Sequence, residues 1–143
     1  MVVLMKKTIS KLKKELDKWF SLYIRLRDAM PVSGLVQCFT CGKIAHYKKG
    51  GMQCGHFQSR RHHATRWNEQ NCQVQCVKCN MFSGSGEQWK FGLNLNAKYG
   101  EGTSHELQML AQTTAKKMRF EYEEDILYYK THVNNLKKEK GIE

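Results

Sequence analysis

The sequence has little proline and no long apolar run. Pro31 is its one proline, so the segments before and after Pro31 contain no proline, the residue that most strongly breaks helices. No stretch approaches the ~20 apolar residues that cross a membrane as a helix. The opening residues 1–5 are too short for the apolar region of a secretory signal, and their lysines follow instead of preceding them. We therefore expect a cytoplasmic protein with no membrane span.

Acidic residues are also scarce. The 143 residues include 13 Asp and Glu against 24 Lys and Arg, a formal net charge of +11. Such an excess favours a polyanionic partner, because bound phosphates release their condensed counterions. An anionic membrane surface, or a solvated basic surface with no partner, would fit the charge as well. The hydrophobic share of 41% predicts a folded chain.

The six cysteines fit metal binding better than disulfides, since we expect a reducing compartment. Four of them form two CxxC motifs, Cys38 with Cys41 and Cys76 with Cys79. Two such turns can present four thiolates to one ion, and thiolates select zinc over magnesium. The alternative, a pair of redox dithiols, lacks the βαβ context of a thioredoxin-like fold. We predict a structural zinc that holds the fold together, because a site with four protein ligands is closed to substrate.

The organisation of the chain predicts one α+β domain over residues 1–143. An amphipathic basic helix is expected over residues 8–30, with an apolar stripe of Leu12, Leu16, Trp19, Tyr23 and Leu26. Residues 31–86 should form zinc-bound hairpins, with extended pieces at 52–57 and 72–76. Residues 87–140 should be helical, in segments 87–99, 103–117 with Thr103 as N-cap and Glu106 completing a capping box, and 120–138.

Four further residues receive structural assignments. Cys54 and Cys72 are predicted to be buried small residues on the hairpin strands, with zinc exchange as the alternative. Trp67 and Trp89 are predicted to lie in the core, with base stacking as the alternative.

Between and around the two CxxC motifs the sequence resembles a nuclease motif. Gly55-His56-Phe57 follows a glycine pair, Asn71 lies five residues before Cys76, and Asn80 directly follows Cys79. This order is similar to the HNH motif in its H-N-N form, and the layout is similar to the endonuclease VII Holliday-junction resolvases. The chain resembles more closely still the NinG/Rap family of phage recombination endonucleases. The residues that carry this match, within about 16–100, are segments 21–28, 55–57, 65–68, 71–72, 75–80, 83–84 and 99–100.

The resemblance implies a ββα-metal core and a role for each motif residue. His56 is the expected general base, since imidazole accepts a proton near neutrality. Asn80 is the expected ligand of a catalytic Mg²⁺ or Mn²⁺, which prefers oxygen donors. Asn71 is expected to join hairpin to hairpin and orient the His56 loop. Arg66, and with it Arg60 or Arg61, is predicted to bind DNA phosphates through a guanidinium.

One position departs from the HNH pattern. Most HNH enzymes place an aspartate or histidine directly before the base as a second metal ligand, whereas this chain has Gly55. His62 or His63 could supply that ligand, as could Asn68 or Glu69. A phosphate-facing basic loop is the alternative interpretation of His62 and His63.

The sequence therefore predicts a metal-dependent DNA endonuclease in the cytoplasm, the host's if the chain is phage-encoded. The resemblance implies branched recombination intermediates, Holliday junctions or D-loops, as substrates, and symmetric cleavage of a junction would favour a homodimer. Two alternatives stay open: a nicking or restriction-like HNH nuclease acting on duplex DNA, and a zinc-ribbon DNA-binding module without catalysis.

Overall fold

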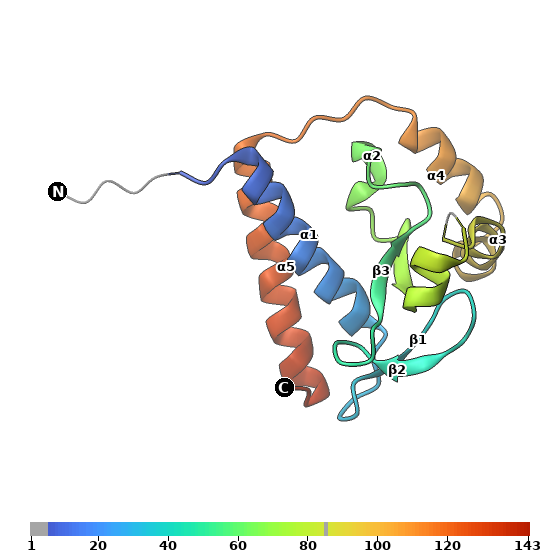
Figure 1. The fold of residues 1–143 in the computed structure, drawn as a ribbon. Helices are drawn as coiled ribbons and strands as arrows, with labels where there is room; N and C mark the ends of the chain where they lie inside the picture. Colours follow the sequence, from blue (N-terminus) through green and yellow to red (C-terminus); the bar gives the residue numbers. More distant parts are fainter. Residues whose placement is uncertain (1–5, 85) are drawn as a thin grey trace.

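A computed structural model describes residues 6–84 and 86–143, and it combines helices with two small antiparallel sheets (Figure 1). The predicted α+β class is therefore confirmed. In chain order the elements are α1 Ile9–Arg27, β1 Leu35–Gln37, β2 Ile44–His46, β3 Gln53–His56, α2 His63–Arg66, β4 Cys72–Gln75, the π-helical turn η1 Lys78–Phe82, α3 Gln88–Tyr99, α4 Thr103–Ala111 and α5 Arg119–Lys140.

The N- and C-terminal helices α1 and α5 lie side by side and run in the same direction (Figure 1). Near their starts, Arg119 donates to the carbonyl of Lys7 at 2.5 Å. Near their ends, the Lys140 ammonium donates to the carbonyls of Leu26, Arg27 and Ala29 at 2.7 to 2.9 Å. A helix leaves its last carbonyls without partners, so this ammonium caps α1 and complements its dipole.

Helix α1 is present where the sequence predicts it, begins after the N-cap Thr8 and ends with the C-cap Asp28, short of Met30. Its buried stripe differs from the predicted one. Phe20 and Ile24 are fully buried, whereas Trp19 and Tyr23 only pack against the edge of the core. Leu12, Leu16 and Leu26 are buried as predicted, and only the two middle positions are displaced by one residue. Helix α1 is contacted from two sides, by α5 and by β3 and β4.

Each CxxC motif lies beside one of the two hairpins. Strand β1 pairs with β2, with Val36 opposite Ala45, and the first CxxC turn lies between these strands. Strand β3 pairs with β4, with His56 opposite Cys72 and Cys54 opposite Val74. The two extended pieces predicted at 52–57 and 72–76 are thus confirmed as one hairpin. Asn80 lies in η1, a single turn after the second CxxC motif begins.

The C-terminal helices follow the prediction with two corrections. Helix α4 has Gly102 as its N-cap and ends at Ala111, so Thr103 is its first helical residue and the predicted extension to Lys117 is wrong. The Thr103 hydroxyl donates to the Gly100 carbonyl at 2.7 Å instead of accepting from the helix. Gly102, with φ of 93°, adopts a conformation that glycine tolerates, and it therefore takes the cap.

Of the two tryptophans predicted to lie in the core, Trp67 packs against the core and Trp89 is exposed to solvent. Trp67 packs edge-on against Tyr122, with ring centroids 5.7 Å apart, as a core residue should. Trp89 is 80% exposed on α3, so its predicted core placement is wrong. The helix instead buries Phe91 and Leu95 in a second apolar cluster with Phe57. No helix in residues 6–84 and 86–143 has the length and apolar character needed to span a membrane.

Candidate metal centre and active-site cleft

The two CxxC turns bring four sulfur atoms together. The Sγ atoms of Cys38, Cys41, Cys76 and Cys79 all lie within 4.8 Å of one another, and those of Cys41 and Cys76 are 3.6 Å apart. Zinc–sulfur bonds of 2.3 Å in a tetrahedron place the sulfurs about 3.8 Å apart. The four cysteines could therefore bind one structural zinc, which would join the β1–β2 hairpin to the end of β4.

The surroundings of Cys38 suit a thiolate ligand, whereas burial raises the pKa of Cys79 to about 12. Burial acts to raise the pKa of Cys38, but hydrogen bonds from backbone N–H groups of Cys76 and Cys41 and from Thr40 lower it to about 6. Donors directed at the sulfur thus favour the charged form that a metal requires. Gly42, with φ of 81°, allows the tight turn that follows Cys41.

His56 stands at the end of β3 and has a defined tautomer. Its Nε2 lies 3.0 Å from the carbonyl oxygen of Arg66. A carbonyl can only accept, so Nε2 carries the hydrogen and Nδ1 keeps a lone pair in the neutral ring. Burial lowers the pKa of His56 below 6.5; the Arg66 carbonyl opposes this shift and the Arg60 charge adds to it. His56 is therefore neutral at pH 7 and able to accept a proton at Nδ1.

Asn71 holds in place the loop that follows His56 and leads to α2. Its side chain is fully buried, with Oδ1 accepting from the backbone N–H of Gln58 at 2.8 Å. Its Nδ2 donates to the carbonyls of Gln58 and Thr65 at 3.1 and 3.0 Å. These bonds tie the residue before β4 to Gln58, in the loop after β3, and to Thr65 in α2.

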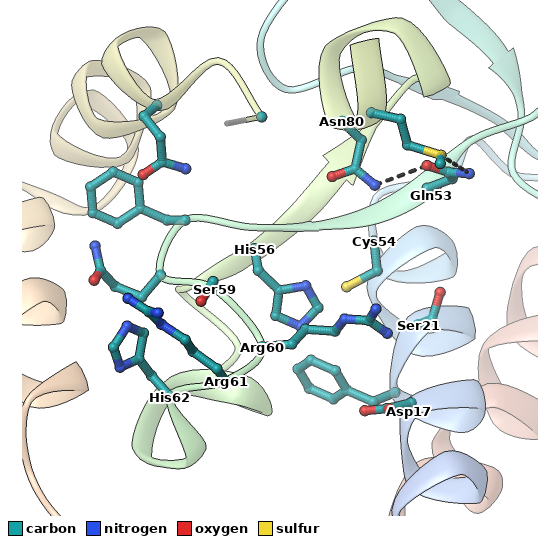
Figure 2. A pocket seen from close by; sticks show the side chains of 16 residues that line it. Asp17, Ser21, Gln53, Cys54, His56, Ser59, Arg60, Arg61, His62 and Asn80 are labelled. Atoms are coloured by element: carbon teal, nitrogen blue, oxygen red, sulfur yellow. Dashed lines mark hydrogen bonds between the residues drawn. The ribbon is translucent and has the colours of Figure 1, made fainter. Parts of the chain in front are cut away.

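His56 and Asn80 line one cleft, whose volume is about 820 Å³ (Figure 2). Asn80 Nδ2 donates to Gln53 Oε1 at 2.8 Å, and this bond turns the Asn80 oxygen Oδ1 to the opposite side. Arg60, Arg61 and His62 line the same cleft from the loop after β3. The cleft thus combines a neutral imidazole, an amide oxygen and two guanidinium groups.

Arg66 is engaged elsewhere. Its guanidinium makes two hydrogen bonds to the carboxylate of Asp17, at 3.1 and 2.5 Å, and the same carboxylate accepts from the Trp67 indole at 2.9 Å. The side chains of Arg66 and Asp17 are 15% and 23% exposed. Arg66 therefore connects α2 to α1, and its carbonyl positions His56.

The candidates for a second metal ligand are separated by the fold. His62 lines the cleft, whereas His63 packs edge-on against Trp67 with ring centroids 5.8 Å apart. The Asn68 oxygen accepts from the backbone N–H groups of Gln70 and Asn71, both at 2.9 Å.

Glu69 is not among the residues that line the cleft, and two tyrosines bind its carboxylate. Tyr23 donates to its carboxylate at 2.9 Å and Tyr129 at 3.1 Å. Burial, with Glu69 contributing, raises the pKa of Tyr23 to about 12. Both tyrosines therefore stay protonated as donors, and Glu69 serves the contact between α1, α5 and the loop before β4.

Among the cleft residues that sequence reasoning did not assign to this site are Asp17, Gln53 and Cys54. Asp17 lies on α1, about 40 residues before His56, and no local pattern connects the two. Gln53 and Cys54 precede the motif and lie on the same strand as His56. The alternation of a strand could have placed Cys54 on the face of His56.

The comparisons with known proteins identify one family. The model of the family described as Bacteriophage Lambda NinG protein matches residues 3–139. No curated protein and no solved structure matches the chain.

Proposed function

This chain belongs to the NinG family, and on that premise we propose that it is a metal-dependent DNA endonuclease of the HNH type. In this proposal β3, β4 and η1 correspond to the ββα unit of such enzymes. The finer assignment, branched recombination intermediates as substrates, rests on the resemblance of the motif residues to phage recombination endonucleases.

The single observation that carries the proposal is the state of His56 in the cleft. Its Nε2–H is bound to the Arg66 carbonyl and its pKa is lowered by burial, so Nδ1 is unprotonated at neutral pH. A general base needs this combination of correct protonation, fixed orientation and access to substrate. The Arg66 carbonyl would also stabilise the imidazolium that forms when Nδ1 takes a proton.

The other cleft residues supply binding and charge. Arg60 and Arg61 are exposed, which leaves them able to bind phosphate oxygens through bidentate hydrogen bonds. Asn80 Oδ1 is a hard oxygen donor suited to Mg²⁺ or Mn²⁺, and His62 is the cleft residue that could add a second ligand. A divalent ion held there would supply charge stabilisation for the phosphate.

The reaction would be hydrolysis of a phosphodiester. His56 Nδ1 removes a proton from a water molecule, and the resulting hydroxide attacks phosphorus. The bond from phosphorus to the 3′ oxygen breaks, and that oxygen takes a proton from solvent. The ends are a 5′-phosphate and a 3′-hydroxyl, as HNH relatives leave.

The test compares cleavage of a four-way DNA junction with cleavage of matched linear duplex, in Mg²⁺ and in Mn²⁺. The wild type is expected to cut the junction, and His56→Ala to lose about 10²- to 10⁴-fold in rate with unchanged DNA affinity. Equal cleavage of both substrates would reassign the enzyme to ordinary duplex. Binding of DNA with no cleavage in either metal would overturn the nuclease assignment and leave a zinc-containing DNA-binding module.

A further inference from the structure

A second group of metal-type ligands lies at the base of the cleft, outside the four-cysteine cluster. One ring nitrogen of His56 and the Sγ atoms of Cys54 and Cys72 all lie within 4.8 Å of one another. Figure 2 shows the Cys54 sulfur beside the His56 ring. The group arises from the register of the hairpin, because His56 is opposite Cys72 and Cys54 shares the strand face of His56.

The ring of His56 is already oriented as a metal ligand would be. Metal-binding histidines commonly donate their other ring N–H to a backbone carbonyl, which fixes the tautomer. The Arg66 carbonyl accepts in this way from His56 Nε2 at 3.0 Å, and the same oxygen is 3.5 Å from the Cys72 sulfur. One carbonyl thus lies beside two members of the group, and Nδ1 is left with the available lone pair.

Charged side chains surround the group. Burial raises the pKa of Cys72 well above its ordinary value, Cys54 adds to this shift, and Asn71 and Arg27 oppose it. Arg25 faces Cys54, and Arg60 and Asp17 face His56. Buried thiols without a cation stay protonated, whereas a bound Zn²⁺ would exchange for the two thiol protons and leave a neutral unit of two thiolates, imidazole and metal.

We propose that Cys54, His56 and Cys72 form a second site for a soft divalent metal such as Zn²⁺, with the fourth coordination position open to the cleft. Cys54 is half-buried on the cleft wall and Cys72 is fully buried behind it, so the open position faces the solvent side. Three protein ligands with one open position is the arrangement of zinc sites that keep a water or an exchangeable ligand. The site differs from the closed four-cysteine cluster in this respect.

The consequence for activity rests on the proposed function. Because Nε2 carries the hydrogen, a soft metal at this site would bind His56 through Nδ1, the atom that the nuclease needs as its base. Zn²⁺ would therefore inhibit cleavage in competition with proton transfer, while Mg²⁺, which avoids thiolates, would not occupy the site. Whether the metal binds at this site can be tested without any nuclease activity.

A disulfide between the two cysteines fits the hairpin less well. Cys54 is paired with Val74, so Cys54 and Cys72 are diagonal neighbours across the strands. Diagonal neighbours have Cβ atoms about 7 Å apart or slightly less, whereas a disulfide needs about 3.8 Å. A metal ion tolerates the wider spacing because it lies between the sulfurs.

The experiment uses the full chain, kept reduced and loaded with one equivalent of Zn²⁺ for the four-cysteine cluster. Co²⁺ is then added, and thiolate-to-cobalt charge transfer in the near ultraviolet is recorded. The wild type is expected to bind one further equivalent with this absorption, and Cys54→Ser to bind it about tenfold or more weakly. Ser59→Ala, which changes the cleft wall outside the group, is the matched control and should retain the signal.

A second measurement needs no variant. Alkylation of Cys54 in the wild-type protein is followed by mass spectrometry with one and with two equivalents of Zn²⁺, and the second equivalent is expected to slow it at least tenfold. Absence of a second thiolate–cobalt signal, an equal signal in Cys54→Ser, or no protection of Cys54 would each overturn the proposal. Conversion of the pair to a disulfide without metal uptake would overturn it also.

The two proposals fail separately. Cobalt binding and Cys54 protection are measured without DNA, so a protein that never cuts DNA can still show the second metal site. A protein that cuts DNA in Mg²⁺ but ignores the second equivalent of Zn²⁺ retains the nuclease assignment and loses this one.

Discussion

The side-chain oxygen Oε1 of Gln75 lies 2.0 Å from the point where a Cβ atom on Gly55 would stand. Gln75 is fully buried, and its Nε2 donates to Thr40 Oγ1 at 3.1 Å and to the Gly86 carbonyl at 2.8 Å. Among the residues that the structure describes, Oε1 itself has no hydrogen-bond partner. The space that a side chain at position 55 would occupy is thus filled from the neighbouring strand.

Gly55→Asp is therefore expected to destabilise the protein and not to add a working ligand. The new side chain collides with a fixed amide, an overpacking that costs about 2 kcal/mol or more. Denaturant unfolding measures the change, and the double variant Gly55→Asp/Gln75→Ala should recover part of it. Gly84→Asn is the control, since nothing lies within 4 Å of that Cβ position and asparagine tolerates its φ of 57°. Unchanged stability of Gly55→Asp would show that Gln75 moves freely.

The pH dependence of cleavage follows from the lowered pKa of His56. The base works as neutral imidazole, so kcat/KM should fall only as pH drops through a midpoint below the ordinary 6.5. Arg60→Gln removes a cation that lowers this pKa and should move the midpoint upward. DNA affinity measured over the same pH range is the control. A midpoint above 6.5 in the wild type would exclude His56 as the group that limits the rate.

Arg60 also lines the cleft as an exposed cation, and a contact between Arg60 and a DNA phosphate would make DNA affinity depend on salt concentration. Arg60→Ala should weaken binding of all DNA sequences and reduce the slope of log affinity against log salt by about 1. Lys138→Ala, an exposed charge at the end of α5, matches the loss of charge without touching the cleft. Equal slopes for the two variants would remove Arg60 from the DNA interface.

Cys76→Ser tests the four-cysteine cluster. Loss of one ligand should release the zinc and unfold the region around both hairpins, because metal binding and folding are coupled in such sites. Zinc content and circular dichroism measure the two effects, and a chelator should reproduce them in the wild type. Ser83→Ala, just after η1, is the control. A folded Cys76→Ser protein that still carries this zinc would contradict the assignment.

Lys140 is expected to contribute to stability out of proportion to its place near the end of the chain. Its ammonium donates to three carbonyls at the end of α1, and burial lowers its pKa. Lys140→Ala should reduce the free energy of unfolding by about 1.5 kcal/mol, the lower end for hydrogen bonds to a charged group, because the site is partly exposed. Lys138→Ala on the exposed side of the same turn should change it by less than about 0.5 kcal/mol. Similar losses in both variants would mean that the cap contributes nothing specific.

Several features were available from the sequence because their causes are local. The CxxC spacing places two sulfurs on one turn whatever surrounds it, so the four-cysteine cluster could be predicted. The helical period, Thr8 and Gly100 defined α1 and the end of α3 within a few residues. His56 and Asn80, both named from the motif spacing, line one cleft, and the hairpin places His56 opposite Cys72, the residue after Asn71.

What only the tertiary structure decided depends on contacts between distant segments. Asp17 on α1 takes the Arg66 guanidinium, and no spacing rule joins residues 49 positions apart. Trp89 is exposed because α3 turns Phe91 and Leu95 toward Phe57 instead. The group of Cys54, His56 and Cys72, and the obstruction of Gly55, follow from strand register, since a shift of one residue would send every side chain to the other face. Motifs and helix ends depend on residues close in the sequence and can be predicted from it, whereas strand register and helix docking depend on tertiary packing.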